Sequence, residues 1–151
     1  MATDKAKDAP TIDYWHLYVD DEGVSRHRRC TMTEFQQKAI SGDAAPQWIG
    51  QEHQGRTTVL FTVLPQGWVG EWHENPAPQW IVPLSGRWFV EAMDGSRVEM
   101  GPGEISFGAD QGCREVDGRK GHLSGTVGDA PCRMMLIQLD AAPKGSGCPF
   151  S

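Results

Sequence analysis

The chain has 151 residues, which is enough for one domain with one hydrophobic core. Its composition, 38% hydrophobic and 23% charged, is that of a globular protein and argues against intrinsic disorder. The formal net charge is −6, and a dense basic cluster occurs only at residues 26–29. This argues against nucleic acid as a partner, because phosphate contacts need a basic face. We expect residues 26–29 to form a solvated loop or the edge of a sheet.

Neither a membrane span nor an export signal is evident in the sequence. No apolar run approaches the ~20 residues needed to cross a bilayer, and residues 1–10 lack the apolar centre of a signal peptide. We therefore expect a cytoplasmic protein. The cysteines form no Cys-x-x-Cys pair, which argues against a structural zinc site. In a reducing compartment all four should be free thiols, namely Cys30, Cys113, Cys132 and Cys148.

The N-terminal region predicts a hairpin after a flexible lead at residues 1–12. Aromatic and β-branched residues at 14–19 predict a strand. The acidic turn at 20–23 should return the chain into a second strand at 24–31.

One short helix is expected after this hairpin. Thr33 has the character of an N-cap, with Gln36 or Gln37 positioned to reach back as in a capping box. The helix should end near Ile40, because Ser41 and Gly42 follow.

From residue 57 onward, short β-prone segments alternate with turns, and Asp94-Gly95 is a strong hairpin signal. This pattern predicts an antiparallel, all-β sandwich or barrel in a single domain over residues 13–139, followed by a flexible tail at 140–151. The tryptophans should serve the core or a dimer interface. The expected strands lie at residues 57–63, 80–83, 88–93, 97–100, 104–107, 123–127 and 132–139.

Residues 67–86 carry the first motif with chemical content. Gly67 is followed by five residues and then His73; Asn75 stands two positions later, Gln79 four further, and Gly86 seven further. This spacing resembles the first motif of the cupin superfamily, whose His-x-His and Glu residues hold a metal. Asn75 occupies the place of the second His, and Gln79 the place of the Glu.

A second stretch resembles the second cupin motif. Gly95 is followed by five residues and then Gly101-Pro102-Gly103, after which the family has a His on the next strand. Ser106 stands at the shortest spacing, so the candidate is His122, which lies beyond a longer loop at residues 108–121. The resemblance covers residues 57–139 and is to small single-domain bacterial cupins. It implies an antiparallel double-stranded β-helix, the jelly-roll or cupin barrel.

The resemblance also implies a pocket around His73 and His122. If a metal is held there, His73, Gln79 and His122 would bind it, with Asn75 as a weak fourth ligand. Fe, Mn, Ni, Cu or Zn would suit such a site. Carboxamides in place of imidazole and carboxylate should weaken binding. Without a metal, the two histidines would act as general acid and base, while Asn75, Gln79 and Ser124 would contact the substrate.

Three functions are compatible with these features. The first is a small cupin-type enzyme, of isomerase, lyase or dioxygenase type, acting on a small oxygenated organic molecule. The second is a ligand-binding or sensor barrel without turnover. The third is a structural dimer module. We expect a small-molecule ligand or substrate, a homodimer, and neither nucleic acid nor membrane as partner.

Overall fold

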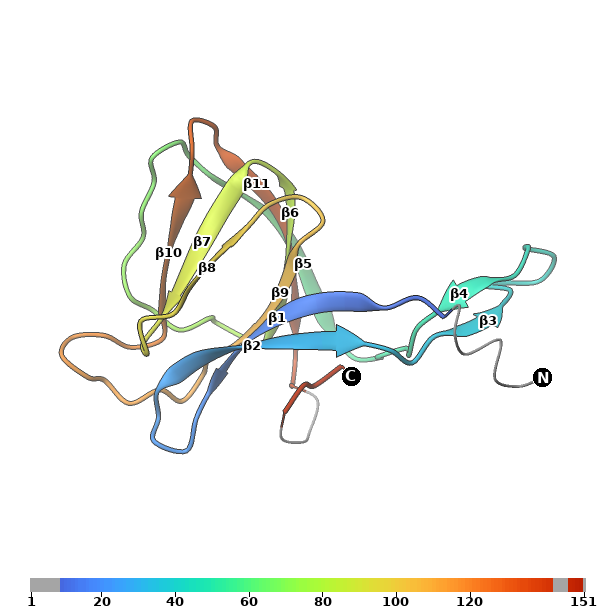
Figure 1. Cartoon of the computed structure of the whole chain (residues 1–151), viewed down its shortest axis with the longest axis horizontal. Helices are drawn as coiled ribbons and strands as arrows, with labels where there is room; N and C mark the ends of the chain where they lie inside the picture. Colours follow the sequence, from blue (N-terminus) through green and yellow to red (C-terminus); the bar gives the residue numbers. More distant parts are fainter. Residues whose placement is uncertain (1–8, 143–146, 151) are drawn as a thin grey trace.

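The computed structural model describes residues 9–142 and 147–150. Within these ranges the chain is entirely β-structure, with eleven strands and no helix (Figure 1). The strands are β1 (Ile12–Val19), β2 (Ser25–Met32), β3 (Gln36–Lys38), β4 (Gln47–Ile49), β5 (Thr57–Leu64), β6 (Gln79–Ser85), β7 (Arg87–Ala92), β8 (Arg97–Met100), β9 (Ile105–Ala109), β10 (His122–Val127) and β11 (Cys132–Leu139). The described part of the chain contains no helix long and apolar enough to cross a membrane.

Two sheets form the body of the molecule. The larger one has six strands in the order β2-β1-β9-β6-β11-β5, and the smaller one has three in the order β10-β7-β8. All pairings in these sheets are antiparallel except that of β1 with β9. The expected strands of the N-terminal hairpin and of residues 57–139 are therefore confirmed, with shifts of a few residues at their ends. A closed barrel is not found among the described strands.

The basic run at residues 26–29 lies on β2, which is one border of the six-stranded sheet. This confirms the expectation of a strand edge. The guanidinium of Arg28 stacks over the ring of Tyr18, and that of Arg29 over Trp15. The basic side chains therefore cover aromatic residues of the adjacent strand β1.

The helix expected over residues 33–40 is wrong. This region contains β3, which pairs with β4 in a separate two-stranded arm, with Gln37 opposite Trp48. Figure 1 shows the arm projecting away from the two main sheets. The physical reason is that so short a helix is unstable in water by itself, whereas β3 gains backbone hydrogen bonds by pairing with β4.

The core occupies both faces of the six-stranded sheet. Its inner face, which we define as the one turned toward β10, β7 and β8, packs against the smaller sheet. The two sheets together contribute eight buried residues to this core: Leu17, Ile81, Trp88, Val90, Ala92, Met100, Cys132 and Met134. Its outer face carries an aromatic cluster of Tyr14, Phe107 and Phe150, with Trp80 packed against it. Trp80 thus faces away from Gln79, as strand alternation predicts.

The expectation of four free thiols is wrong for two of them. Cys30 on β2 is bonded to Cys148, 118 residues later, whereas Cys113 and Cys132 are free and buried. The reason is that the end of the chain returns to the outer face, where Phe150 inserts into the aromatic cluster. Residues 147–150 are therefore packed, in contrast to the expected flexible tail. The expected flexible lead lies outside the described residues up to position 8.

Candidate functional site

His73 and His122 lie side by side although 48 residues separate them. Each donates a backbone N–H to the carbonyl of the other, at 3.0 and 2.9 Å, and their ring centroids are 4.6 Å apart. Gly121 permits this bridge, because its φ is +84° and a Cβ there would collide with the His73 carbonyl. The pairing expected from the two motifs is therefore present in the fold.

The environments of the two imidazoles differ. His122 begins β10 and is only 4% exposed, whereas His73 lies in the connection between β5 and β6 and is exposed. The Nδ1 of His73 is 2.7 Å from the carbonyl oxygen of Glu71. A carbonyl only accepts, so Nδ1 carries the hydrogen, and Nε2 is the nitrogen left for other contacts.

A buried carboxylate orients His122. Asp110 follows β9, is 0% exposed, and its Oδ2 lies 2.7 Å from Nδ1 of His122. Burial raises the pKa of this carboxyl, but the hydrogen bond and charge of His122, together with two donors from Asn75, outweigh it and leave the pKa below its usual range. Asp110 is therefore ionised, and Nδ1 of His122 donates to it. The free nitrogen of His122 is then Nε2.

Carboxamides extend this network. The backbone N–H and the side-chain Nδ2 of Asn75 both donate to Oδ1 of Asp110, each at 2.8 Å. Asn75 Oδ1 accepts from Gln79 at 2.6 Å, and Gln79 Oε1 accepts from Gln138 at 3.1 Å. These contacts connect the Asp110 carboxylate, directly or through a neighbour, to His122 and to three carboxamide side chains. They also determine which side-chain atom of Asn75 and of Gln79 is the oxygen and which is the nitrogen.

The strand pattern explains why this network lies at one end of the inner face. Gln79 and Gln138 are register partners on β6 and β11, and Gln79 is also opposite Gly108 on β9. Gly108 is required there, because a Cβ at this position would lie 2.5 Å from Asn75 Nδ2. Ser124 is buried two residues after His122, on the same side of β10.

Two members of the network, Asp110 and Gln138, are not among the residues that the motifs select. Asp110 lies in the Gly-rich stretch 108–121, which the sequence predicts to be a loop, and Gln138 follows the apolar run 134–137 of β11. The sequence signal that could have selected them is strand alternation, which places every second residue on the same face of the sheet. Asp110 shares a face with Ser106 and Gly108, and Gln138 shares one with Leu136. By contrast Asp117, also in the loop, has no hydrogen bond or ion pair to the network.

The loop after β9 is anchored to the segment that carries His73. Glu74 accepts from the backbone of Gly112 at 2.7 Å and forms an ion pair with Lys120 at 3.1 Å. The guanidinium of Arg119 lies over the ring of Trp72. Cys113, within the loop, is buried and its thiol donates to the carbonyl of Asp110 at 3.1 Å. Glu74 therefore holds this loop in place.

The donor set does not fit a tightly bound divalent metal. In residues 9–142 and 147–150 no group of three or more His, Cys, Asp or Glu side chains is placed to hold one. Gln79 is engaged at both ends of its amide, and the Asp110 carboxylate is saturated by His122 and Asn75. The expected ligand set of His73, Gln79 and His122 thus offers two imidazoles and one occupied carboxamide.

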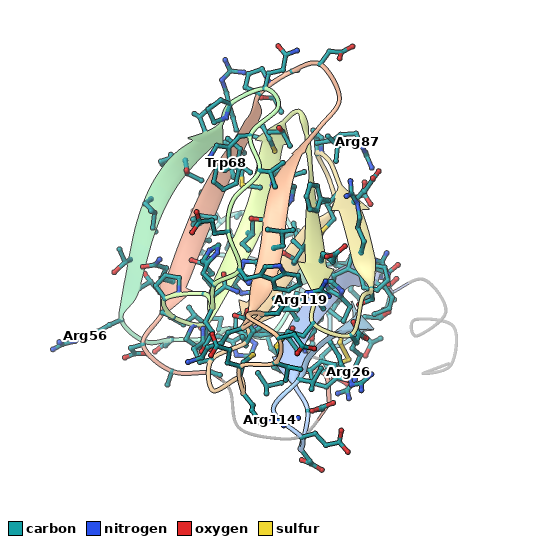
Figure 2. All side chains as sticks on the ribbon, turned by 90° about the vertical axis from the view of Figure 1, so that its left-hand side faces the viewer. Arg26, Arg56, Trp68, Arg87, Arg114 and Arg119 are labelled. Atoms are coloured by element: carbon teal, nitrogen blue, oxygen red, sulfur yellow. A yellow bond between two sulfur atoms is a disulfide. The ribbon has the colours of Figure 1, made fainter. Side chains whose placement is uncertain are left out.

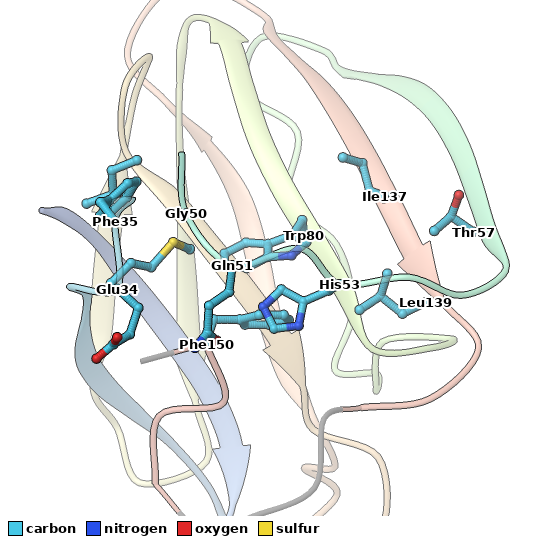
Figure 3. Close-up of a pocket in the computed structure, with 12 residues that line it drawn as sticks. Glu34, Phe35, Gly50, Gln51, His53, Thr57, Trp80, Ile137, Leu139 and Phe150 are labelled. Atoms are coloured by element: carbon cyan, nitrogen blue, oxygen red, sulfur yellow. The ribbon is translucent and has the colours of Figure 1, made fainter. Parts of the chain in front are cut away.

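An apolar pocket lies on the opposite, outer face of the six-stranded sheet. Its volume is about 330 Å³ (Figure 3). Phe35 from the base of the β3–β4 arm, Trp80 from β6 and Phe150 from the chain end supply aromatic walls. Aliphatic side chains from β1, β2 and β11 also line the pocket, namely Ile12, Met32, Ile137 and Leu139. His53 stands edge-on to Phe150, with ring centroids 4.6 Å apart. The sequence does not indicate this pocket, because its walls come from six separate segments.

Comparison with known proteins leaves the family of this chain undetermined. No protein-family model matches the chain, and no curated protein matches it. Among solved structures, the chain is similar to protein NMB1881 from Neisseria meningitidis, at 15% sequence identity and a TM-score of 0.38. The match covers 60% of this chain and 79% of that one.

Proposed function

We propose that this chain is a small-molecule enzyme that uses His122 and His73 for acid–base chemistry on an oxygenated substrate. The observation that carries the proposal is the contact between the buried Asp110 carboxylate and Nδ1 of His122, next to the exposed imidazole of His73. A carboxylate behind an imidazole holds one tautomer and stabilises the cation that forms on proton uptake.

The division of roles follows from the surroundings of each ring. His122, backed by Asp110, is the base: its Nε2 takes a proton from a carbon or hydroxyl next to a carbonyl. His73 is the acid, since it is exposed and can regain a proton from solvent. Return of that proton at a neighbouring atom gives isomerisation, and loss of water gives dehydration. An isomerase or lyase therefore fits these residues better than a metal-dependent dioxygenase.

We further propose that the fold is a cupin-type jelly roll. Support comes from the spacing of Gly67, His73, Gln79 and Gly86, and from two sheets that enclose the inner core. In this interpretation the buried polar network occupies the end of the barrel interior where cupins hold their metal. Asp110 and the carboxamides then replace the metal-binding side chains of those proteins.

The test is proton exchange, which reports a general base whatever the later steps are. Wild-type protein would be incubated in D2O with a panel of 2-oxo acids, 3-oxo acids and hydroxyketones, and loss of α-proton signals followed by NMR. His122→Gln and Asp110→Asn should slow exchange of the active substrate by about 100-fold or more. Asp117→Asn, the same carboxylate-to-amide change at a position outside the network, should leave the rate unchanged.

A role for the histidines in folding alone predicts a different result. In that case no panel member exchanges faster than in buffer, or His122→Gln melts early while its exchange rate per folded molecule equals that of wild type. Either result would remove the proposed activity.

The second candidate is a ligand-binding protein without turnover, and the outer pocket favours it. Its aromatic walls and its volume of about 330 Å³ suit one small, uncharged aromatic molecule. N-phenyl-1-naphthylamine serves as the probe, read by its fluorescence. Phe35→Ser should weaken its binding about tenfold or more, whereas Phe61→Ser, an exposed position outside the pocket, should not. Equal binding by both variants would contradict this candidate.

A further inference from the structure

The two borders of the six-stranded sheet are protected very differently. β2 carries three arginines and a histidine at consecutive positions. β5, at the other border, reads Thr-Thr-Val-Leu-Phe-Thr-Val-Leu and has no charge, proline or glycine. Natural sheets block free edges with charges, prolines or bulges, because an unpaired edge recruits another strand. The β5 edge has none of these features.

β5 is also long, regular and open. All eight of its residues pair with β11 in one continuous register, Thr57 to Leu139 through Leu64 to Cys132. Within the described residues, no strand pairs with its other side. Figure 2 shows β5 as the outermost strand of the sheet, beside β11. An antiparallel strand hydrogen-bonds each neighbour through alternate residues, so half of the β5 backbone groups point outward.

The outward side chains of β5 repeat symmetrically. Phe61 is 69% exposed, and Val59 and Val63, two positions away on either side, are each 54% exposed. If two copies of β5 pair antiparallel about Phe61, each Val59 faces Val63 of the other copy, and the two Phe61 rings meet. Aromatic and β-branched cross-strand pairs of this kind stabilise antiparallel sheets. The segment is thus complementary to itself.

We propose that a second copy of this chain binds at β5, through antiparallel β5–β5 pairing across a two-fold axis at Phe61. The two six-stranded sheets then form one continuous sheet. A two-fold interface uses the same patch on both subunits, which this pattern satisfies. A different protein would need no such symmetry about Phe61. The inference is independent of the acid–base site, because the interface leaves His73 and His122 untouched.

The first experiment measures mass in solution by light scattering at about 100 μM chain. Wild type should be a dimer, and Phe61→Lys a monomer with an unchanged circular dichroism spectrum. Two controls replace other exposed apolar residues: Val69→Lys, away from the large sheet, and Leu84→Lys, on β6. Both should remain dimers. A wild-type monomer overturns the proposal, as does a dimer that Leu84→Lys dissociates while Phe61→Lys does not.

The second experiment tests the axis itself. Directly opposite residues of an antiparallel pair have Cα atoms about 4.5–5.5 Å apart, a separation that a disulfide spans. Phe61→Cys should therefore give a covalent dimer on mild oxidation, and Leu84→Cys should not. Cross-linking through Leu84→Cys but not through Phe61→Cys would contradict edge pairing. It would indicate a dimer in which the outer faces of the two sheets pack together.

Discussion

The fully buried carboxylate of Asp110 accepts a hydrogen bond from Nδ1 of His122 at 2.7 Å. The same carboxylate accepts two hydrogen bonds from Asn75. Three segments that are remote in sequence are thereby joined at one ion: the connection before β6, the end of β9 and the start of β10. These three hydrogen bonds hold the site together, and the effects of mutation and pH on the site follow from them.

Replacing Asp110 should affect stability and histidine chemistry together. In Asp110→Asn, one amide must replace a carboxylate that accepts from both His122 and Asn75. Removal of the acceptor of a buried hydrogen bond costs about 1–3 kcal/mol of unfolding free energy. Urea unfolding at pH 7 measures this. Asp117→Asn, in the same loop but outside the network, is the control and should change stability by less than about 0.5 kcal/mol.

The Asp110 interaction also sets an acid limit to stability. Its pKa is lower in the folded than in the unfolded chain, so its contribution is fully present above the unfolded pKa of about 4. It is lost as pH falls from there through the folded value. The wild-type unfolding curve should therefore steepen below pH 4, and Asp110→Asn should lack this component. Identical pH slopes for the two proteins would contradict the assignment.

Two other histidines should make stability depend on pH in a higher range. Burial lowers the pKa of His16 to about 4, with a further lowering by the charge of Arg28, and burial lowers that of His27 to about 4 as well. Both are neutral in the fold, whereas the unfolded chain takes up protons below about pH 6.5. Stability should thus be complete above pH 6.5 and fall between pH 6.5 and 4.

The size of that fall follows from 1.36 kcal/mol per pKa unit, which gives roughly 3 kcal/mol for His16. Unfolding measured at pH 7.0, 5.5 and 4.5 tests it. His16→Gln should flatten the dependence by this amount. A stability curve with no slope between pH 6.5 and 4.5 would refute neutral burial.

The contact between Gly108 and Asn75 makes a double-mutant cycle informative. In Gly108→Ala the new methyl group displaces the Asn75 amide from Asp110, at an expected cost of about 1–3 kcal/mol. In the background of Asn75→Ala the same methyl group has space, so the cost should largely vanish. Coupling of at least about 1 kcal/mol between the two sites is expected from thermal or urea unfolding. Additive effects would show that Gly108 serves another purpose.

The disulfide should stabilise the outer aromatic cluster. Cys30–Cys148 links residues 118 positions apart and holds Phe150 beside Tyr14 and Trp80. Cys148→Ser should lower unfolding stability by about 2–5 kcal/mol and change the near-ultraviolet dichroism of these rings. Cys132→Ser is no equivalent control, because that thiol lies in the inner core. Treatment of wild type with dithiothreitol should instead reproduce the effect of Cys148→Ser, and should leave that variant unchanged.

Much of the fold is predictable because strand signals are local. Alternation and turn residues place nearly every strand from residue 57 onward, including both ends of β11. The arm is not predictable from the same signals. The capping residue Thr33 indicates a helix, but whether a helix or a strand forms depends on pairing with β4, the strand that contains Trp48. That partner is adjacent only in the folded chain.

For the candidate site, the sequence by itself selected several of the residues that lie together in the fold. The spacing of the two motifs is sufficient to select His73, Asn75, Gln79 and His122. Only the tertiary structure decided what they bind. It placed Asp110 behind His122, turned the carboxamides toward that anion and toward each other, and brought Cys148 onto Cys30. Hydrogen bonds and disulfides need atoms within a few ångströms, and for residues far apart in sequence that proximity exists only after the sheets have packed.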